Sequence, residues 1–241
     1  MSARARIGTS GYSYKHWKGV FYPDDVPQRR WLEYFAERFD TVELNNPFYS
    51  MPTEDKCDGW RERAPQGFVY AVKMNRVITH RKYLKDAERM IGDYLDAVDR
   101  LGEHLGPVLV QLPPNWHADL ARLDDFLDRV PTGYRWAVEF RDPDWLSEPT
   151  FDILRKHNAA LVVHDLIDNH PDLATADWTY RRYHGTAGKY QGQYTPQKLR
   201  AEADRILEDL EAGRDVYAYF NNDVGGYAVR DALKLRDFVS G

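Results

Sequence analysis

Four side chains capable of catalysis stand at or near the ends of short apolar runs: Glu43, Lys73, Glu139 and His184. A carboxylate that a neighbouring cation keeps ionised can act as a general base, so Glu139 is the candidate base, with Arg141 or Lys73 as the cation. A lysine can instead form a Schiff base, but nearby carboxylates are expected to keep Lys73 protonated, which weakens that alternative. These four residues are the predicted catalytic set.

Further polar residues near the run ends share faces with this set. Alternate side chains of an extended strand point to the same side. Four pairs follow that parity: Glu43 with Asn45, Glu139 with Arg141, Arg182 with His184, and Asn221 with Asp223. The predicted ligand-binding set is Tyr14, Asn45, His80, Gln111, Arg141, Arg182, Tyr194, Asn221 and Asp223. We expect one cavity to be lined by Glu43, Lys73, Glu139, Arg141, Arg182, His184 and Asn221.

Eight apolar runs must position these residues. They cover residues 6–10, 41–45, 68–73, 108–111, 135–141, 160–165, 179–184 and 215–221. Long loops and helix-like stretches follow nearly all of them. This alternation predicts an α/β fold, a single TIM-type (β/α)8 barrel over residues 1–241 with a parallel, closed sheet. The stretch 166–177 is short and interrupted by proline, so we expect the sixth connection to be irregular.

Apolar residues at spacings of three or four predict the helices between the strands. One such stripe runs through Ala87, Met90, Ile91, Tyr94, Val98, Leu101 and Leu105. Shorter stripes lie within 120–130 and 199–210, and glycine or proline marks tight returns at 64–67, 105–107 and 131–133. The long loops therefore gather at one end of the barrel, as a binding face requires.

Composition limits the class of protein. The chain has 241 residues, 43% of them hydrophobic, which suits one barrel and a sizeable core. We predict no membrane span and no secretory signal, and the lone Cys57 excludes an internal disulfide and suits a reducing cytoplasm. A net charge of −5 disfavours broad binding to nucleic acid, although a local basic groove stays open. The sequence does not predict an oligomeric state.

The first functional hypothesis is an enzyme acting on an anionic, phosphorylated or sugar-like small molecule without an obligatory metal. TIM barrels often bind phosphate in the loops after strands seven and eight, here residues 184–189, which include Lys189, and 221–226. Aromatic residues such as Tyr12 and Tyr190 suit a sugar or a base. Phe21, Phe48 and Trp145 are expected to anchor loops instead. We therefore predict no cofactor and a bound anion near Arg141 or Arg182.

Three alternatives stay open. A divalent metal such as zinc or manganese, in an endonuclease-like site, could be held by Glu43, Glu139, Asp165, His80, His164 and His184, with the basic run 76–85 tracking nucleic acid. Nucleic acid is the less favoured partner because that basic run also fits a solvated loop. Glu43 and Glu139 could form the carboxylate pair of an inverting glycosidase. The barrel could also bind a metabolite and catalyse nothing.

The chain also carries motifs of a known family. They lie at 10–14, 21–23, 42–49, 78–80, 111–114, 139–145, 182–185 and 219–223. In this order they resemble the successive motifs of the YecE-like family (DUF72), from about residue 6 to the C-terminus. Pro47 and Asp142 depart from that pattern beside the expected pocket. The resemblance implies a TIM-type barrel of the bacterial or archaeal cytoplasm whose activity is not established.

Overall fold

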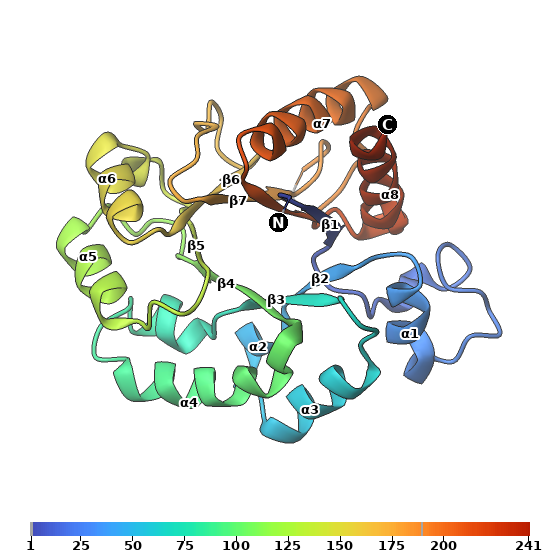
Figure 1. The fold of residues 1–241 in the computed structure, drawn as a ribbon, viewed down its shortest axis with the longest axis horizontal. Coiled ribbons are helices and arrows are strands. Elements are labelled where there is room, and N and C mark those ends of the chain that lie inside the picture. Colours follow the sequence, from blue (N-terminus) through green and yellow to red (C-terminus); the bar gives the residue numbers. More distant parts are fainter. Residues whose placement is uncertain (1, 189) are drawn as a thin grey trace.

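The structure is a computed structural model that describes residues 2–188 and 190–241. Eight parallel strands form a ring surrounded by helices (Figure 1). The strands are β1 (Ala5–Thr9), β2 (Thr41–Leu44), β3 (Val69–Lys73), β4 (Leu105–Gln111), β5 (Trp136–Glu139), β6 (Ala160–His164), β7 (Trp178–Tyr183) and β8 (Asp215–Phe220). The predicted parallel barrel is confirmed.

The ring closes between β1 and β2 with less regular pairing than elsewhere. β1 pairs with β8 along its whole length, whereas it meets β2 through a single parallel bridge between Ser10 and Glu43. Gly8 allows this approach, because a Cβ at that position would lie 2.3 Å from the carbonyl oxygen of Thr41. The barrel is therefore nearly closed.

Six of the seven connections between consecutive strands contain an α-helix in the described part of the chain, and a further helix follows β8. The helices are α1 (Trp31–Ala36), α2 (Asn46–Tyr49), α3 (Glu54–Arg63), α4 (Glu88–Val98), α5 (Leu120–Arg129), α6 (Glu148–Lys156), α7 (Pro196–Glu211) and α8 (Tyr227–Ser240). Between β6 and β7 no helix forms, as predicted for the sixth connection. No helix in the described part is both long and apolar enough to cross a lipid bilayer.

One predicted helix boundary is wrong. The apolar stripe was extended to Leu105, but α4 ends at Val98 and Leu105 begins β4. Gly102 adopts a φ of 57°, which breaks the short helical turn that follows α4. The 105–107 segment is accordingly the start of the strand and not a turn.

The core has two layers, as the alternating strand pattern predicts. Inside the barrel lie residues such as Ala71, Leu109, Ala137, Tyr180 and Tyr219. A larger apolar cluster fills the space between the strands and the helices. The interior is thus packed in its middle, so any ligand must bind above it, at the carboxyl ends of the strands.

Candidate functional site

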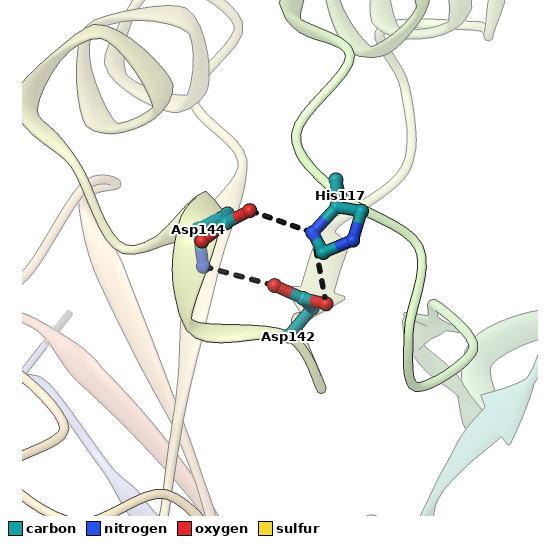
Figure 2. Close-up of side chains that lie close together, drawn as sticks. All are labelled: His117, Asp142 and Asp144. Carbon is teal, nitrogen blue, oxygen red and sulfur yellow. Dashed lines mark hydrogen bonds and ion pairs between the residues drawn. The ribbon is translucent and has the colours of Figure 1, made fainter.

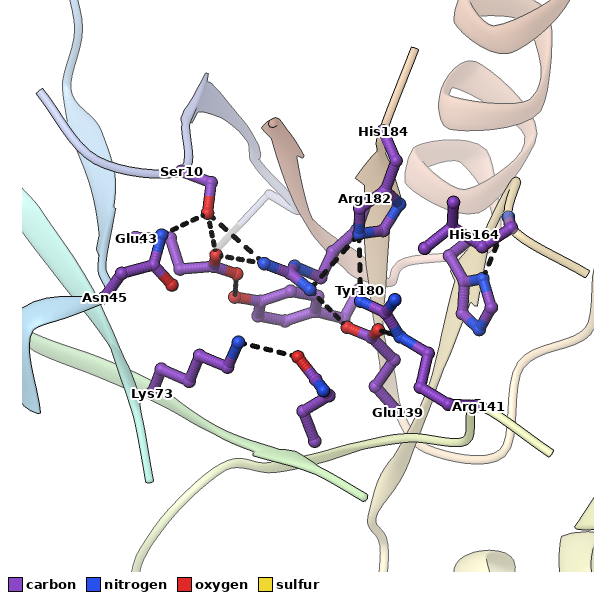
Figure 3. Close-up of polar contacts among 12 residues, drawn as sticks. Ser10, Glu43, Asn45, Lys73, Glu139, Arg141, His164, Tyr180, Arg182 and His184 are labelled. Carbon is purple, nitrogen blue, oxygen red and sulfur yellow. Dashed lines mark hydrogen bonds and ion pairs between the residues drawn. The ribbon is translucent and has the colours of Figure 1, made fainter. Parts of the chain in front are cut away.

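Two carboxylates are buried just beneath the mouth of the barrel, Glu43 from β2 and Glu139 from β5. Arg182 from β7 bridges them (Figure 3). One Nη atom lies 2.7 Å from Glu43 Oε1 and the other contacts Glu139 Oε2. Glu43 also accepts hydrogen bonds from the hydroxyl groups of Ser10 and Tyr180. All three charged side chains are almost completely buried.

The guanidinium groups determine the charge of this network. Burial alone would raise the pKa of Glu43, but Arg182 and the two hydroxyl groups hold it below its ordinary value. Burial opposes ionisation of Glu139 too, yet Arg141 and Arg182 keep its pKa well below the usual range. Both carboxylates are therefore ionised at neutral pH.

His184 extends the network toward the loop after β6. Its Nε2 atom lies 3.2 Å from Arg141 Nη2, and its Nδ1 atom lies 3.2 Å from Asp165 Oδ1. A guanidinium can only donate, so Nε2 is the acceptor and Nδ1 carries the proton that Asp165 accepts. Burial lowers the pKa of His184, in agreement with a neutral imidazole. His184 thus orients Arg141.

These residues form the floor of the mouth; we call Glu43, Glu139, Arg141, Arg182 and His184 the floor network. Its two carboxylates are matched by two guanidinium groups. Glu139 and His184 have no exposed surface, so neither is placed to take a proton from a ligand. The same burial keeps Glu43 and Glu139 from flanking a glycosidic bond as a glycosidase pair would.

Lys73 projects from the end of β3 and has a different environment. Its Nζ donates a hydrogen bond to Gln111 Oε1 at 2.6 Å and lies 4.1 Å from the centre of the Phe48 ring. It forms no ion pair with any carboxylate in the described part of the chain. Burial, helped by the positive charge of Arg182, lowers the pKa of Lys73 to about 7. Glu139 and Glu43 raise the pKa of Lys73 in the expected direction, but burial outweighs them.

Two cavities open above the floor network. The first, about 710 Å³, is lined by Gly11, Tyr12, Ser13, Tyr14, Asn45, Asn46, Tyr49, Asp55, Lys56, Gly59, Trp60, Arg63, Lys73, Tyr190, Asn221 and Asp223. The second, about 630 Å³, is lined by Phe48, Tyr49, Lys73, Arg76, His80, Arg81, Gln111, Pro114, Arg141, Leu166, Ile167 and Tyr190. Lys73, Tyr49 and Tyr190 belong to both. Lys73 therefore stands at the boundary of the two cavities.

The predicted residues divide between cavity and floor. Of the seven expected to line one cavity, Lys73, Arg141 and Asn221 line one or both, while Glu43, Glu139, Arg182 and His184 do not. Their inward direction was predicted correctly, but ion pairs among Glu43, Glu139 and Arg182, and the hydrogen bonds of His184, bury those four side chains. The expectation that all seven share a cavity is therefore wrong.

The remaining predicted ligand-binding residues lie mostly at the mouth. The first cavity includes Tyr14, Asn45 and Asp223, and the second includes His80 and Gln111. Burial and the neighbouring cations lower the pKa of His80 to about 4, so it is neutral there. Tyr194 is the exception, because it is buried beside β8 and its hydroxyl contacts Asp165.

One face of α3 lines the mouth of the barrel, which the sequence did not predict. Lys56, Trp60 and Arg63 line the first cavity from that helix. Their spacing of four and three residues places them on one side of a helix, which was the available signal. The sequence did not show that this side faces the mouth instead of solvent.

Several amides in the loops expected to hold phosphate already have a partner within the protein. Gly185 N donates to the Tyr194 hydroxyl, Ala187 N to Gln191 O, and Gly226 N to Asp223 O. Lys189 lies outside the described residues. The cations that line the second cavity come from the end of β3 and from the loops after β3 and β5.

The six predicted metal ligands do not gather around one point. His164, for example, uses Nε2 with Phe140 O at 2.7 Å and Nδ1 with the amide of Leu166. Among the described residues, three donor atoms converge at the rim in His117, Asp142 and Asp144 (Figure 2), and again in Asp124, Asp128 and His157. His117 pairs with Asp144 at 2.6 Å, and Asp142 accepts the amide of Asp144. The His117–Asp144 ion pair and the turn closed by Asp142 account for the arrangement in Figure 2.

Comparison with known protein families shows to which family the chain belongs. The family described as "Protein of unknown function DUF72" matches residues 6–241. The chain belongs to the DUF72 family. It is 28% identical over 118 residues to the UPF0759 protein YecE of Escherichia coli K12, a match that spans 48% of this chain and 43% of YecE. It is 23% identical to the UPF0759 protein YunF of Bacillus subtilis, over 90% of this chain and 89% of YunF.

Solved structures show the same fold in this DUF72 protein and its relatives. A DUF72 family protein from Thermotoga maritima superposes with a TM-score of 0.88 and 26% identity, covering 99% of this chain and all of the other. A DUF72 family protein from Enterococcus faecalis gives 0.83 and 20% identity, covering 98% and 96%. These matches confirm the family and the barrel, and they assign no ligand.

Proposed function

We propose that the mouth of the barrel binds an anionic small molecule, with its acidic group in the second cavity. The observation that carries this proposal is the charge of that cavity. Four cationic side chains line it, Lys73, Arg76, Arg81 and Arg141, and no carboxylate is among its described lining residues. Arg141 is already paired with Glu139, but Arg76 and Arg81 are in no ion pair in the described part of the chain, and such cations around a concave space favour an anion through charge-assisted hydrogen bonds.

The first cavity complements this site with aromatic surfaces. Tyr12, Tyr14, Tyr49 and Trp60 line it, together with carboxylate and amide groups from Asp223 and Asn221. Aromatic planes beside polar groups suit a sugar or another ring with hydroxyl substituents. Because the two cavities share Lys73, a single molecule can place its ring in the first and its phosphate or carboxylate in the second. A sugar phosphate is the simplest compound of this kind.

A variant of Arg81 can distinguish a specific anion site from a general electrostatic attraction to the loop. Replacing Arg81 by Gln removes a charge from the second cavity and is expected to weaken binding of ribose 5-phosphate about tenfold, the loss typical of a charge-assisted hydrogen bond. Lys82→Gln is the matched control, because Lys82 is adjacent but bonds to Asp86 O outside the cavity. Isothermal titration calorimetry measures both affinities.

Two outcomes would contradict the proposal. One is that Lys82→Gln weakens binding as much as Arg81→Gln, which would mean that only the general field of the loop attracts the ligand. The other is that ribose binds as tightly as ribose 5-phosphate. Affinity should also fall as the salt concentration rises, since part of the attraction is screened.

A further inference from the structure

We propose that Lys73 captures a carbonyl group of the ligand as an imine, so that the substrate class is an aldehyde or ketone that also carries an anionic group. This inference rests on the proposed function, because it places the acidic group in the second cavity and the carbonyl group at its boundary with the first. It names the reaction of that same site.

The position of Lys73 fits a reacting group. The side chain rises from the end of β3, is only 8% exposed, and lines both cavities. The apolar Phe48 ring holds one side of the amine at 4.1 Å. A carbonyl carbon that bridges the two cavities must pass this nitrogen. Burial also excludes most of the water that would compete for the carbonyl carbon.

The charge balance leaves this amine without a counterion. Glu43 and Glu139 are shared between Arg182 and Arg141, so two negative charges meet two positive ones. Asp165 is occupied by His184 and Tyr194. A third cation in this volume is disfavoured, and the amine loses its proton more readily than an exposed lysine does. The neutral amine is the nucleophilic form.

Gln111 orients the nitrogen. Its side-chain oxygen accepts a hydrogen bond from Lys73 Nζ at 2.6 Å. A neutral amine that donates to this oxygen keeps its lone pair free to point elsewhere. A protonated lysine that served only as a structural charge would be expected to lie against a carboxylate instead.

The chemistry balances without any oxidant or reductant. The nitrogen lone pair attacks the carbonyl carbon, a C–N bond forms, and the C=O π pair moves to oxygen. A proton passes from nitrogen to that oxygen and gives a carbinolamine. A second proton transfer from nitrogen to the hydroxyl group releases water as the C=N bond forms. Amine and carbonyl thus give imine and water, and the imine withdraws electrons from the adjacent carbon.

Reductive trapping tests the inference on the intact protein. The probe is pyridoxal 5′-phosphate, an aldehyde with a phosphate group, followed by sodium borohydride and peptide mapping by mass spectrometry. At pH 7 we expect a single reduced adduct on Lys73. Inorganic phosphate should compete, and pyridoxal without its phosphate should react much more slowly. Because the pKa of Lys73 is about 7, the trapping rate should rise about tenfold per pH unit below 7 and level off above it.

Two variants make the test specific. Lys73→Arg keeps a cation in both cavities but cannot form an imine, so it should still bind ribose 5-phosphate and yield no adduct. Lys73→Met removes the amine without adding a buried charge and should also yield no adduct while remaining folded. Lys82→Arg is the matched control, because Lys82 donates to Asp86 O outside both cavities, and this variant should retain the adduct at Lys73.

The outcomes separate the two proposals. If wild-type protein binds ribose 5-phosphate but borohydride traps nothing at Lys73, the imine is wrong and the anion site stands. Adducts spread over surface lysines, with Lys73 no faster than Lys56, would overturn the imine equally. If Lys73 reacts as fast with pyridoxal as with its phosphate, the anionic part of the substrate class is wrong. Absence of both binding and trapping would refute the proposed function itself.

Discussion

Replacing Arg182 by Met is expected to lower the free energy of unfolding at pH 7 by about 3–5 kcal/mol, the loss typical when one partner of a buried ion pair is removed. Arg182 lies between Glu43 and Glu139, and none of the three has appreciable contact with solvent. Without the guanidinium, two carboxylates remain buried in the same volume. Such a loss is a large share of the stability of an ordinary domain. Urea denaturation followed by circular dichroism measures it.

The pH dependence of this loss has a definite sign. In the wild type the pKa of Glu43 and of Glu139 is lowered, so their stabilising contribution is present above the pKa of an unfolded glutamate, about 4.3, and disappears as the pH falls through the folded values. In Arg182→Met, Glu43 loses its ion-pair partner and Glu139 keeps only Arg141, so both carboxylates should take up protons more easily. The difference between the two proteins should therefore shrink in acid.

Arg135→Met is the control for the Arg182 variant. Arg135 directly precedes β5 and pairs with Asp215 at 2.8 Å, but its side chain is 41% exposed. Its loss should cost only about 0–1 kcal/mol, as for other exposed ion pairs. Equal losses for the two variants would contradict the view that Arg182 neutralises buried charge. Adding Glu43→Gln and Glu139→Gln to Arg182→Met should restore part of the stability.

The strand pattern was sufficient to predict the fold and the inward direction of the floor network. Side chains alternate strictly in an extended strand, so the end residues Glu43, Glu139 and Arg182 had to point into the barrel once the strands were located. The irregular sixth connection was equally predictable, because a short segment that contains proline cannot form a full helix.

The roles of the same residues could not be read from the sequence. Whether Glu139 faces a ligand depends on Arg182, which is 43 residues away and reaches it only across the closed barrel. The protonation of Lys73 depends on the same pairing, because burial and the charge of Arg182 outweigh the two carboxylates, which favour a charged amine. Long-range pairing of this kind leaves no local pattern. A helix face such as that of α3 is ambiguous for the same reason.

Replacing Lys73 by Met is expected to stabilise the fold at neutral and acidic pH. The pKa of Lys73 falls from 10.5 to about 7 on folding, so the folded state disfavours its proton. Folding stability should therefore be greatest above pH 10.5, decrease as the pH falls to about 7, and stay constant below that. The amplitude of this decrease has an upper bound of about 5 kcal/mol, at about 1.4 kcal/mol per pKa unit.

Urea denaturation of wild type, Lys73→Met and Lys73→Arg between pH 6 and about pH 10 tests this expectation. Wild type should approach Lys73→Met as the pH rises, because both then have an uncharged side chain at this position. Lys73→Arg should show no such rise, since a guanidinium keeps its proton throughout the range. If the difference in stability between wild type and Lys73→Met did not depend on pH, the pKa of Lys73 would not be lowered in the folded state. The expected result means that the chain retains a lysine that lowers the stability of the fold at neutral pH. Such a cost is expected at a site whose function needs a neutral amine as nucleophile.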